Sequence, residues 1–310
     1  MYALNGQVHI WDESERTWTP KDSGLSDSVH YASAFDDLNE AVTLLGSDRA
    51  TLEISSADFS WGADCTVLAT TLLEFTGAGS LNVPTGQEVI IRSSGKNWPI
   101  RQIFTGDGTI SFDGNWAIDD IRPEWFGEQS IDDVALLNKT FAAAITPPTR
   151  RTVNMNGGPD YEIDDDLSVA GSMNISGYGV EIVQTSLDTK CFNITSGGVR
   201  ISGLKLTGPN GVSYPASQPL NSVAVFAMGA YNQPAAPDYI EDVVLEDLDI
   251  SEFTTDGIQL RFVRNFKILR NNIHDIYTNI NATTVISMAG LYMNELDGGS
   301  SSASNNKIYS

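Results

Sequence analysis

The chain has 310 residues, which is enough for one elongated domain or two compact ones. Its 40 acidic and 18 basic residues give a formal net charge of −22. This charge argues against nucleic-acid binding, where Lys and Arg must neutralise phosphates, and against docking on an anionic membrane. Two cysteines far apart do not make a disulfide framework. The sequence has no apolar run of about 18 residues and no signal peptide. We therefore expect folding in a cytoplasm and no insertion into a membrane.

Short alternating runs of apolar and polar residues predict strands along most of the chain, separated by the Gly, Asn, Asp and Ser of turns. Two stretches predict helices instead. In 35–46 the apolar residues fall on one face and Gly46 follows as the C-cap, whereas 132–145 has an acidic first turn and ends before two prolines. The clearest predicted strands are 51–54, 88–93, 109–112, 152–155, 179–184 and 199–206.

The two predicted helices belong to an internal repeat. Each follows an Asp-Asp pair, and each is followed by a short loop and a Thr-led strand. We therefore predict two blocks, a smaller mainly-β head or adaptor block over 1–122 and a second block over 123–310. The joint between them reads "RPEWFG". We expect Trp125 and Phe126 to be buried there against the start of the second block and its helix.

A finer repeat occurs within the second block. The segments "VRISGLKLTG" (199–208), "VVLEDLDISE" (243–252) and "FKILRNNIHD" (266–275) align in their apolar positions, and only Asn271 departs. Each copy predicts two short strands, and a third strand follows at 222–228, 256–262 and 289–293. The second and third copies start 23 residues apart, the length of one bare coil.

This pattern predicts an all-β fold, a right-handed parallel β-helix with short capping α-helices, in which each coil pairs only with its neighbours. The helix of 132–145 should cover the open edge of the first coil. A β-sandwich would predict neither the in-register repeat nor a helix at the start of each block. Two columns of side chains should stack across the coils: Val199, Val243 and Phe266, and Ile201, Leu245 and Ile268.

Over about 35–310, the "RPEWFG" joint, the Asp-led helix, "GGPDYEIDDDLSVAGSMNISGYG" (157–179) and "VRISGLKLTG" resemble the pectate-lyase-superfamily β-helix of bacteriophage tailspikes. The resemblance implies a homotrimer in the virion that contacts other phage tail or baseplate proteins and is made in the host bacterial cytoplasm. It implies attachment to a bacterial surface polysaccharide (capsule, lipopolysaccharide or exopolysaccharide), often with cleavage. Because the sequence ends as a further strand begins near Ile308, we expect a C-terminal part beyond residue 310 that completes the β-helix.

The candidate catalytic residue is Asp256, because "TTDGI" (254–258) is similar to the Asn-Thr-Asp-Gly motif of polygalacturonase-type hydrolases, whose Asp is catalytic. Glycoside hydrolysis needs a second carboxylate, and Glu252 and Glu295 are the candidates. The motif here starts with Thr254 instead of Asn, and its Gly-His-Gly and Arg-Ile-Lys companions are absent. Asp-Gly is also a common turn at a strand entry. Hydrolase, lyase and binder without activity all remain open.

The glycan-binding face is predicted on the third strands and their flanking loops, 208–221, 229–240 and 275–288, because inserted loops on a rigid scaffold carry binding residues. Gln259, Arg261 and Tyr292 point outward on that face by alternation, and Arg261 can pair a sugar carboxylate or phosphate. We predict no metal and no cofactor. The alternatives to a polysaccharide-degrading tailspike are a virion protein that only binds glycan or supports the tail, and a free bacterial polysaccharide lyase or hydrolase.

Overall fold

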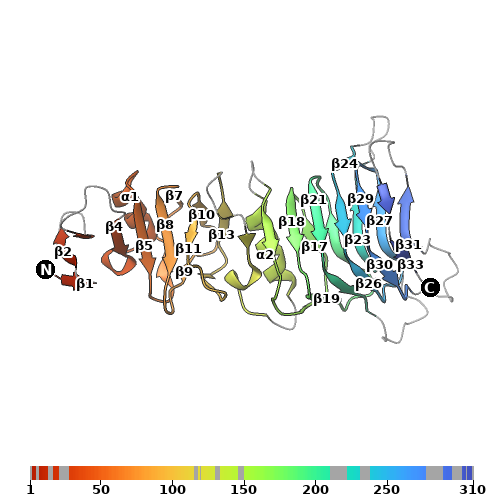
Figure 1. The fold of residues 1–310 in the computed structure, drawn as a ribbon, viewed down its shortest axis with the longest axis horizontal. Coiled ribbons are helices and arrows are strands. Elements are labelled where there is room, and N and C mark those ends of the chain that lie inside the picture. Colours follow the sequence, from red (N-terminus) through yellow and green to blue (C-terminus); the bar gives the residue numbers. More distant parts are fainter. Residues whose placement is uncertain are drawn as a thin grey trace. The chain divides into compact units, whose positions relative to one another are not determined.

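The structure, a computed structural model, is mostly β, with parallel sheets and two α-helices in its described part (Figure 1). Contacts divide the chain into two compact units. Unit 1 is Met1–Asp119 with Glu124–Glu128 and Thr146–Thr149, and unit 2 is Asp120–Pro123, Gln129–Ile145 and Arg150–Ser310. No helix in the described part is long and apolar enough to cross a membrane. The structure describes residues 2–4, 7–12, 17–20, 28–114, 118, 120–129, 133–145, 150–209, 222–230, 238–276, 289–294, 302–304 and 306–308.

Unit 1 combines an antiparallel start with parallel pairing. Strands β1 to β4 pair antiparallel in chain order, and the same sheet continues through β5, β8 and β11 in parallel. Two three-stranded parallel sheets, β13-β10-β7 and β12-β9-β6, complete the unit. The strands are β1 Tyr2–Leu4, β2 Gln7–Asp12, β3 Thr17–Pro20, β4 Ser28–Tyr31, β5 Ala50–Ile54, β6 Phe59–Ser60, β7 Cys65–Val67, β8 Thr71–Phe75, β9 Leu81–Asn82, β10 Glu88–Ile91, β11 Gly95–Lys96, β12 Phe104–Thr105 and β13 Thr109–Phe112.

The first predicted helix is confirmed as α1, Leu38–Leu45, preceded by a 3-10 turn at Ala32–Ala34. Its N-cap is Asp37, whose Oδ1 accepts the Glu40 N–H at 2.8 Å, and the Glu40 side chain accepts the Asp36 N–H at 2.7 Å. The first bond satisfies an N–H group that a helix start leaves without an intrahelical partner, and the second ties the residue before the N-cap to the first turn. Gly46 ends the helix with a φ of 55°, in the left-handed region that favours glycine.

The aromatic pair of the "RPEWFG" joint is buried as expected, with both side chains 5% exposed. Its ring contacts, however, lie within unit 1. Trp125 meets Trp98 edge-on at 4.9 Å between centroids and donates its indole N–H to the Pro99 carbonyl at 3.0 Å, while Phe126 lies 5.5 Å from Phe104. We expected the pair to pack on the second block. These contacts are instead with unit 1, because the 3-10 turn Pro123–Trp125 returns the chain to that unit.

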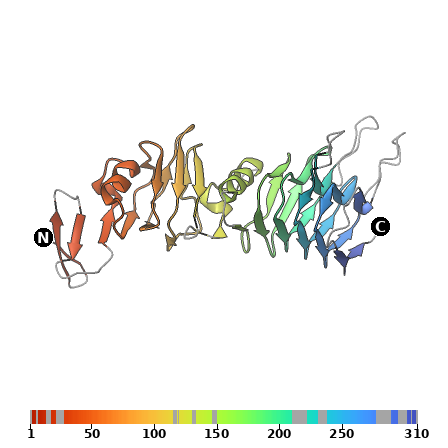
Figure 2. The same ribbon diagram turned by 90° about the horizontal axis from the view of Figure 1, so that it is seen from above.

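Unit 2 is built from three parallel sheets that take successive strands in rotation. When the separate pair β24 and β28 is left out, each strand pairs with the third strand after it. Thus β18 pairs with β21, and β19 pairs with β22. We call three successive strands, one from each sheet, a triplet. In Figures 1 and 2 the colours of unit 2 change from green to blue across the stack of triplets, in chain order. The sheets are β14-β15-β18-β21-β25-β29-β32, β16-β19-β22-β26-β30-β33 and β17-β20-β23-β27-β31, with a small fourth sheet, β24-β28.

The bounds of these strands agree closely with the predicted repeat. The predicted third strands correspond to β23, β27 and β31. The strands are β14 Asp120–Ile121, β15 Thr152–Asn154, β16 Tyr161–Ile163, β17 Leu167–Val169, β18 Met173–Ser176, β19 Glu181–Gln184, β20 Lys190–Ile194, β21 Val199–Ser202, β22 Lys205–Thr207, β23 Val223–Met228, β24 Ile240–Glu241, β25 Val244–Glu246, β26 Asp249–Ser251, β27 Asp256–Arg261, β28 Val263–Arg264, β29 Lys267–Leu269, β30 Asn272–His274, β31 Ala289–Asn294, β32 Ser302–Ser304 and β33 Lys307–Ile308.

The core of unit 2 consists of aliphatic columns that run from triplet to triplet. The predicted column is confirmed, because Ile201 pairs with Leu245 and Leu245 with Ile268, and all three are fully buried. The preceding residues Val199, Val243 and Phe266, predicted to form the neighbouring column, are buried as well. In-register β pairing puts equivalent side chains on the same face of the sheet, so one apolar pattern repeated along the chain builds a continuous core.

The second predicted helix is α2, Val134–Ala144, and it lies against the first triplet. The Asp133 N–H donates to the Glu162 carbonyl at 2.8 Å and its carboxylate accepts the Glu162 N–H at 3.1 Å. Asn138 likewise accepts the Ser168 N–H at 2.8 Å. These bonds satisfy backbone groups on the edge strands β16 and β17, which is what protection of an open sheet edge requires. The Phe141 and Phe192 rings stack 6.2 Å apart.

Candidate functional site

The outward face of the sheet β17-β20-β23-β27-β31 carries a row of side chains that do not belong to the core. Within β27, Ile258 and Leu260 are fully buried, whereas Gln259 between them is half-buried. By register Gln259 lies beside Phe226 of β23, and Phe226 lies beside Asn193 of β20. Alternation therefore places these three residues in one outward row, as predicted for Gln259.

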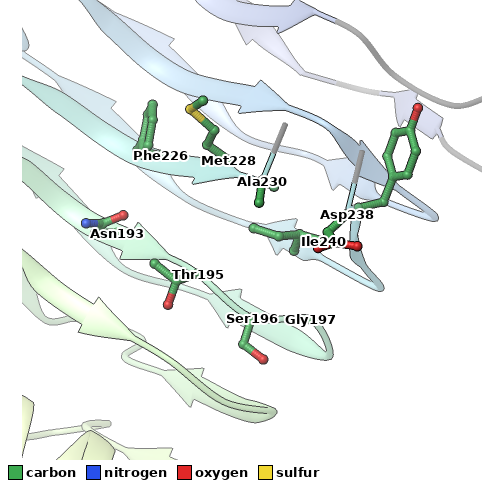
Figure 3. A pocket seen from close by; sticks show the side chains of 11 residues that line it. Asn193, Thr195, Ser196, Gly197, Phe226, Met228, Ala230, Asp238 and Ile240 are labelled. Carbon is green, nitrogen blue, oxygen red and sulfur yellow. The ribbon is translucent and has the colours of Figure 1, made fainter. Parts of the chain in front are cut away.

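A pocket of about 620 Å³ opens on this face, between the outward residues of β20 and β23 and the segment that leads into β24 (Figure 3). Its lining is polar along β20 and apolar along the neighbouring β23. In the described part, Asp238 is the only charged side chain among the lining residues. Asn193 of β20 and the following Thr195 and Ser196 are polar, whereas Phe226 and Met228 of β23 and the following Ala230 are apolar. The segment 238–240 adds Asp238, Tyr239 and Ile240 (Figure 3).

The amide of Asn193 is held in one orientation by Asp166. Asn193 Nδ2 donates to Asp166 Oδ2 at 2.9 Å, and the other carboxylate oxygen accepts the Lys190 N–H at 2.7 Å. A carboxylate only accepts hydrogen bonds, so the amide nitrogen must face Asp166. The amide oxygen is then the atom that Asn193 offers to the pocket.

Two cations lie beside aromatic rings at the pocket. Lys190 Nζ lies 5.3 Å from the centroid of the Phe226 ring. The Arg264 guanidinium lies 5.4 Å from the Tyr239 ring and donates its Nε–H to Glu241 at 2.8 Å. Both contacts favour a fixed position of the ring, because a cation is attracted to the electron-rich ring face.

Asp256, the candidate catalytic residue, is fully buried. It lies two residues before Ile258, which by alternation is the inward side of β27. Two residues before it, the Thr254 hydroxyl lies 2.8 Å from the hydroxyl of Ser222, and the Thr254 N–H donates to Ser222 Oγ at 3.0 Å. The side chain of Asp256 is therefore shielded from solvent in this structure, whereas a polysaccharide binds at the surface. A catalytic role for Asp256 stays a prediction.

Of the two candidate partner carboxylates, Glu252 and Glu295, the structure describes only Glu252. Glu252 lies at the corner between β26 and β27, half-buried, with a φ of 66°. Its N–H donates to the Asp275 carbonyl of the next triplet at 2.9 Å. Glu252 thus occupies a corner position while Asp256 lies on an inward one. Glu295 is outside the described residues.

Arg261 and Tyr292, the other predicted glycan contacts, belong to β27 and β31. Arg261 is half-buried and lies opposite Met228 of the pocket by register, but it does not line the pocket. The backbone of Tyr292 pairs with Gln259, and its side chain is outside the described part. Most of the three predicted binding loops also falls outside the described residues, which include 208–209, 229–230, 238–240 and 275–276 of them.

The predicted glycan contacts lie on the sheet where this pocket opens, but most of the pocket residues were not among them. Tyr239 was recognisable as an aromatic beside a loop, whereas Phe226 and Met228 read as core because they are apolar residues in an apolar strand. The available signal was alternation, since Phe226 falls between the buried Val225 and Ala227. Asn193 gave no signal, because its role depends on the distant Asp166.

A comparison of the chain with protein-family models, with curated proteins and with solved structures found no match. Within the described residues, no group of three or more His, Cys, Asp or Glu side chains is placed to hold a metal ion. The function therefore has to be argued from the fold and the pocket.

Proposed function

We propose that unit 2 is a right-handed parallel β-helix of the tailspike type, and that it attaches to a bacterial surface polysaccharide through the pocket beside Phe226. The rotation of successive strands through three parallel sheets supports the β-helix, because each triplet then forms one coil. Right-handed winding follows the strong preference of parallel crossover connections. A homotrimer in the phage virion, in contact with tail or baseplate proteins, is proposed on the resemblance of the sequence.

The observation that carries the proposal is the composition of the pocket. A sugar has an apolar face of C–H groups and a polar edge of hydroxyls. The pocket offers the rings of Phe226 and Tyr239 together with amide, hydroxyl and carboxylate groups. A concave site that combines apolar and aromatic walls with a few polar groups is the usual form of a small-ligand site.

Attachment fits this pocket better than cleavage does. Hydrolysis of a glycosidic bond by the usual route needs two carboxylates facing the bond, and Asp238 is the one carboxylate among the lining residues of the described part. Degradation of the polysaccharide by Asp256 with Glu252 or Glu295 is a separate proposal that rests on the sequence motif. New reducing ends in the binding mixtures described below would support it.

The test is binding of purified protein to surface polysaccharides from candidate host bacteria, measured by calorimetry. Phe226→Ala and Tyr239→Ala should each weaken binding about tenfold, the scale expected when an aromatic wall is lost. Tyr178→Ala is the matched control, because Tyr178 is an exposed tyrosine in the turn between β18 and β19, away from the pocket lining. Equal losses in all three variants, or none in any, would contradict a site at this pocket.

A further inference from the structure

We infer that the pocket recognises an N-acetylated amino sugar through its acetamido group and discriminates against sugars that carry a carboxylate. This inference rests on the proposed function and adds to it the chemical class of the bound sugar. Three features of the pocket carry it: an oriented hydrogen-bond acceptor, an apolar wall, and a single negative charge.

The oriented acceptor is the amide oxygen of Asn193. Because Asp166 fixes the amide nitrogen at 2.9 Å, Asn193 presents its oxygen to a ligand. In Figure 3 this oxygen is on the side of Thr195, and the nitrogen is on the opposite side. Asp238 adds a carboxylate, which also only accepts. Asn193 and Asp238 therefore both favour a ligand group that donates, such as an amide N–H.

The apolar wall lies beside this acceptor, on the neighbouring strand. Phe226, Met228 and Ala230 follow one another along the chain at the end of β23, and Ile240 adds to them from β24 (Figure 3). Met228 is 39% exposed, so this part of the wall is open to a ligand. Transfer of a methyl group onto such a wall should raise affinity about fourfold. An acetamido group joins a methyl to an amide N–H, so it can use the wall and the acceptor together.

The remaining parts of the acetamido group also have partners. Thr195 and Ser196 have hydroxyls that rotate to donate, and they line the same polar side. Either can donate to the acetamido carbonyl. A parent hexose has a hydroxyl in place of the acetamido group, so it would use the acceptor but leave the apolar wall in water.

The single charge disfavours acidic sugars. A sugar carboxylate in the pocket would face the carboxylate of Asp238 and the amide oxygen of Asn193, both acceptors. The nearby cations are already engaged, Lys190 over the Phe226 ring and Arg264 with Glu241 and Tyr239. The expectation that Arg261 pairs a sugar acid thus applies to the neighbouring strand and not to this pocket.

The experiment uses saturation-transfer NMR on the full chain with the methyl glycosides of three N-acetylhexosamines (gluco, galacto and manno), their parent hexoses and the matching hexuronates. We expect saturation on the acetamido methyl protons of at least one N-acetylhexosamine. The signal should disappear in Phe226→Ala and persist in Tyr178→Ala. In Asn193→Leu the affinity should fall about fivefold, the scale of one lost hydrogen bond. Asp238→Asn should raise hexuronate affinity about fivefold, as expected for removal of one like charge at contact distance.

The outcomes separate the inference from the proposed function. Binding of a hexuronate or of a parent hexose by the unchanged protein as strongly as binding of the N-acetyl counterpart overturns the inference and leaves polysaccharide attachment intact. Binding of whole polysaccharides without binding of any N-acetylhexosamine does the same. Failure of all the glycosides and all the polysaccharides overturns the proposed function and the inference together. Equal melting temperatures of the variants and the unchanged protein show that a lost signal reflects the pocket.

Discussion

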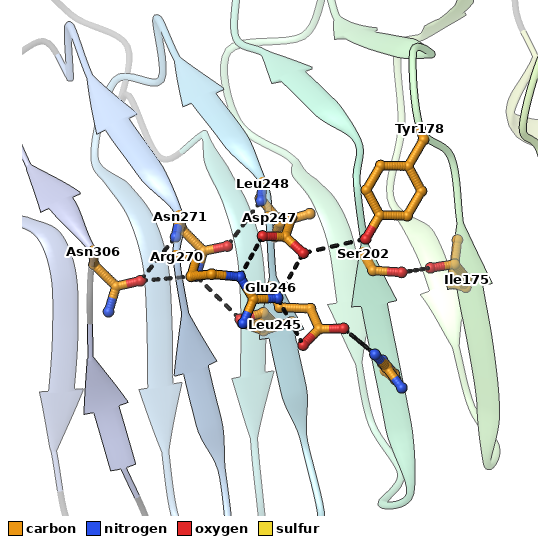
Figure 4. A network of polar contacts seen from close by, with 11 residues as sticks. Ile175, Tyr178, Ser202, Leu245, Glu246, Asp247, Leu248, Arg270, Asn271 and Asn306 are labelled. Carbon is orange, nitrogen blue, oxygen red and sulfur yellow. Dashed lines mark hydrogen bonds and ion pairs between the residues drawn. The ribbon is translucent and has the colours of Figure 1, made fainter.

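Asn271→Leu tests how neighbouring triplets of unit 2 are joined. At this turn position the preceding triplets carry Leu204 and Leu248, and Asn271 is 1% exposed. Its side-chain oxygen accepts the Leu248 N–H at 2.9 Å, and its amide nitrogen donates to the Leu245 carbonyl at 3.1 Å (Figure 4). The Asn306 side chain repeats the arrangement one triplet later, accepting the Asn271 N–H at 3.0 Å. The asparagines therefore form a ladder that binds the backbone turn of the preceding triplet.

The magnitude follows from the groups that the substitution leaves behind. Leucine cannot accept from the Leu248 N–H, and a buried donor without a partner costs about 1–3 kcal/mol. The lost bond to the Leu245 carbonyl adds about 1 kcal/mol. The larger apolar side chain returns at most about 1–1.5 kcal/mol of this. We expect the free energy of unfolding of unit 2 to fall by about 1–3 kcal/mol, although leucine is the residue that the repeat itself predicts.

The assay is urea denaturation together with hydrogen exchange of the Leu248 amide. The matched control is Asn272→Leu. Asn272 is the next residue along the chain, lies on the outward side and donates from its side chain to Asp249 at 2.8 Å. Asn271→Leu should lower the denaturation midpoint more than the control does and should speed exchange at Leu248. Equal midpoints for the two variants, with Leu248 still protected, would refute a ladder that stabilises the turn.

Two further predictions concern single polar contacts. Asp37→Ala should destabilise unit 1 by about 1 kcal/mol through loss of the α1 N-cap, measured by thermal unfolding against Asp36→Ala, and equal effects of the two changes would count against the cap. The pKa of His274 is raised, first by its hydrogen bond to Asp275 and then by Asp249. The stabilisation of the folded state by His274 is therefore complete below the unfolded pKa of about 6.5 and is lost as pH rises through the folded pKa. An unchanged stability–pH profile in His274→Asn and His274→Gln would contradict this.

The inward columns could be predicted because they depend on one local rule. Side chains of a strand alternate between two faces, so the apolar positions of three aligned segments gave Ile201, Leu245 and Ile268 as one column. The same rule also places Asp256 beside Ile258 on the inward side. The motif "TTDGI" pointed instead to catalysis, because a motif contains no information on which face a side chain takes.

Contacts between distant residues could not be predicted in this way. The Asn271 exception was visible in the alignment, but its reason depends on Asn306, which belongs to the next triplet. The partners of Trp125 depend on the route of the chain at the joint, where the 3-10 turn returns to unit 1. The orientation of Asn193 depends on Asp166, which lies in the preceding triplet. In each case the decisive contact crosses more than twenty residues of sequence.

Alternation also explains why the pocket can be altered separately from the core. Phe226 points outward between Val225 and Ala227, and both of these neighbours are fully buried. Removal of an outward side chain leaves the inward columns and their strand pairing unchanged, so the scaffold keeps its main source of stability. Substitutions such as Phe226→Ala and Asp238→Asn should therefore change ligand binding at nearly constant melting temperature. Large losses of stability in these outward variants would mean that the outward row of this face contributes to the core of unit 2.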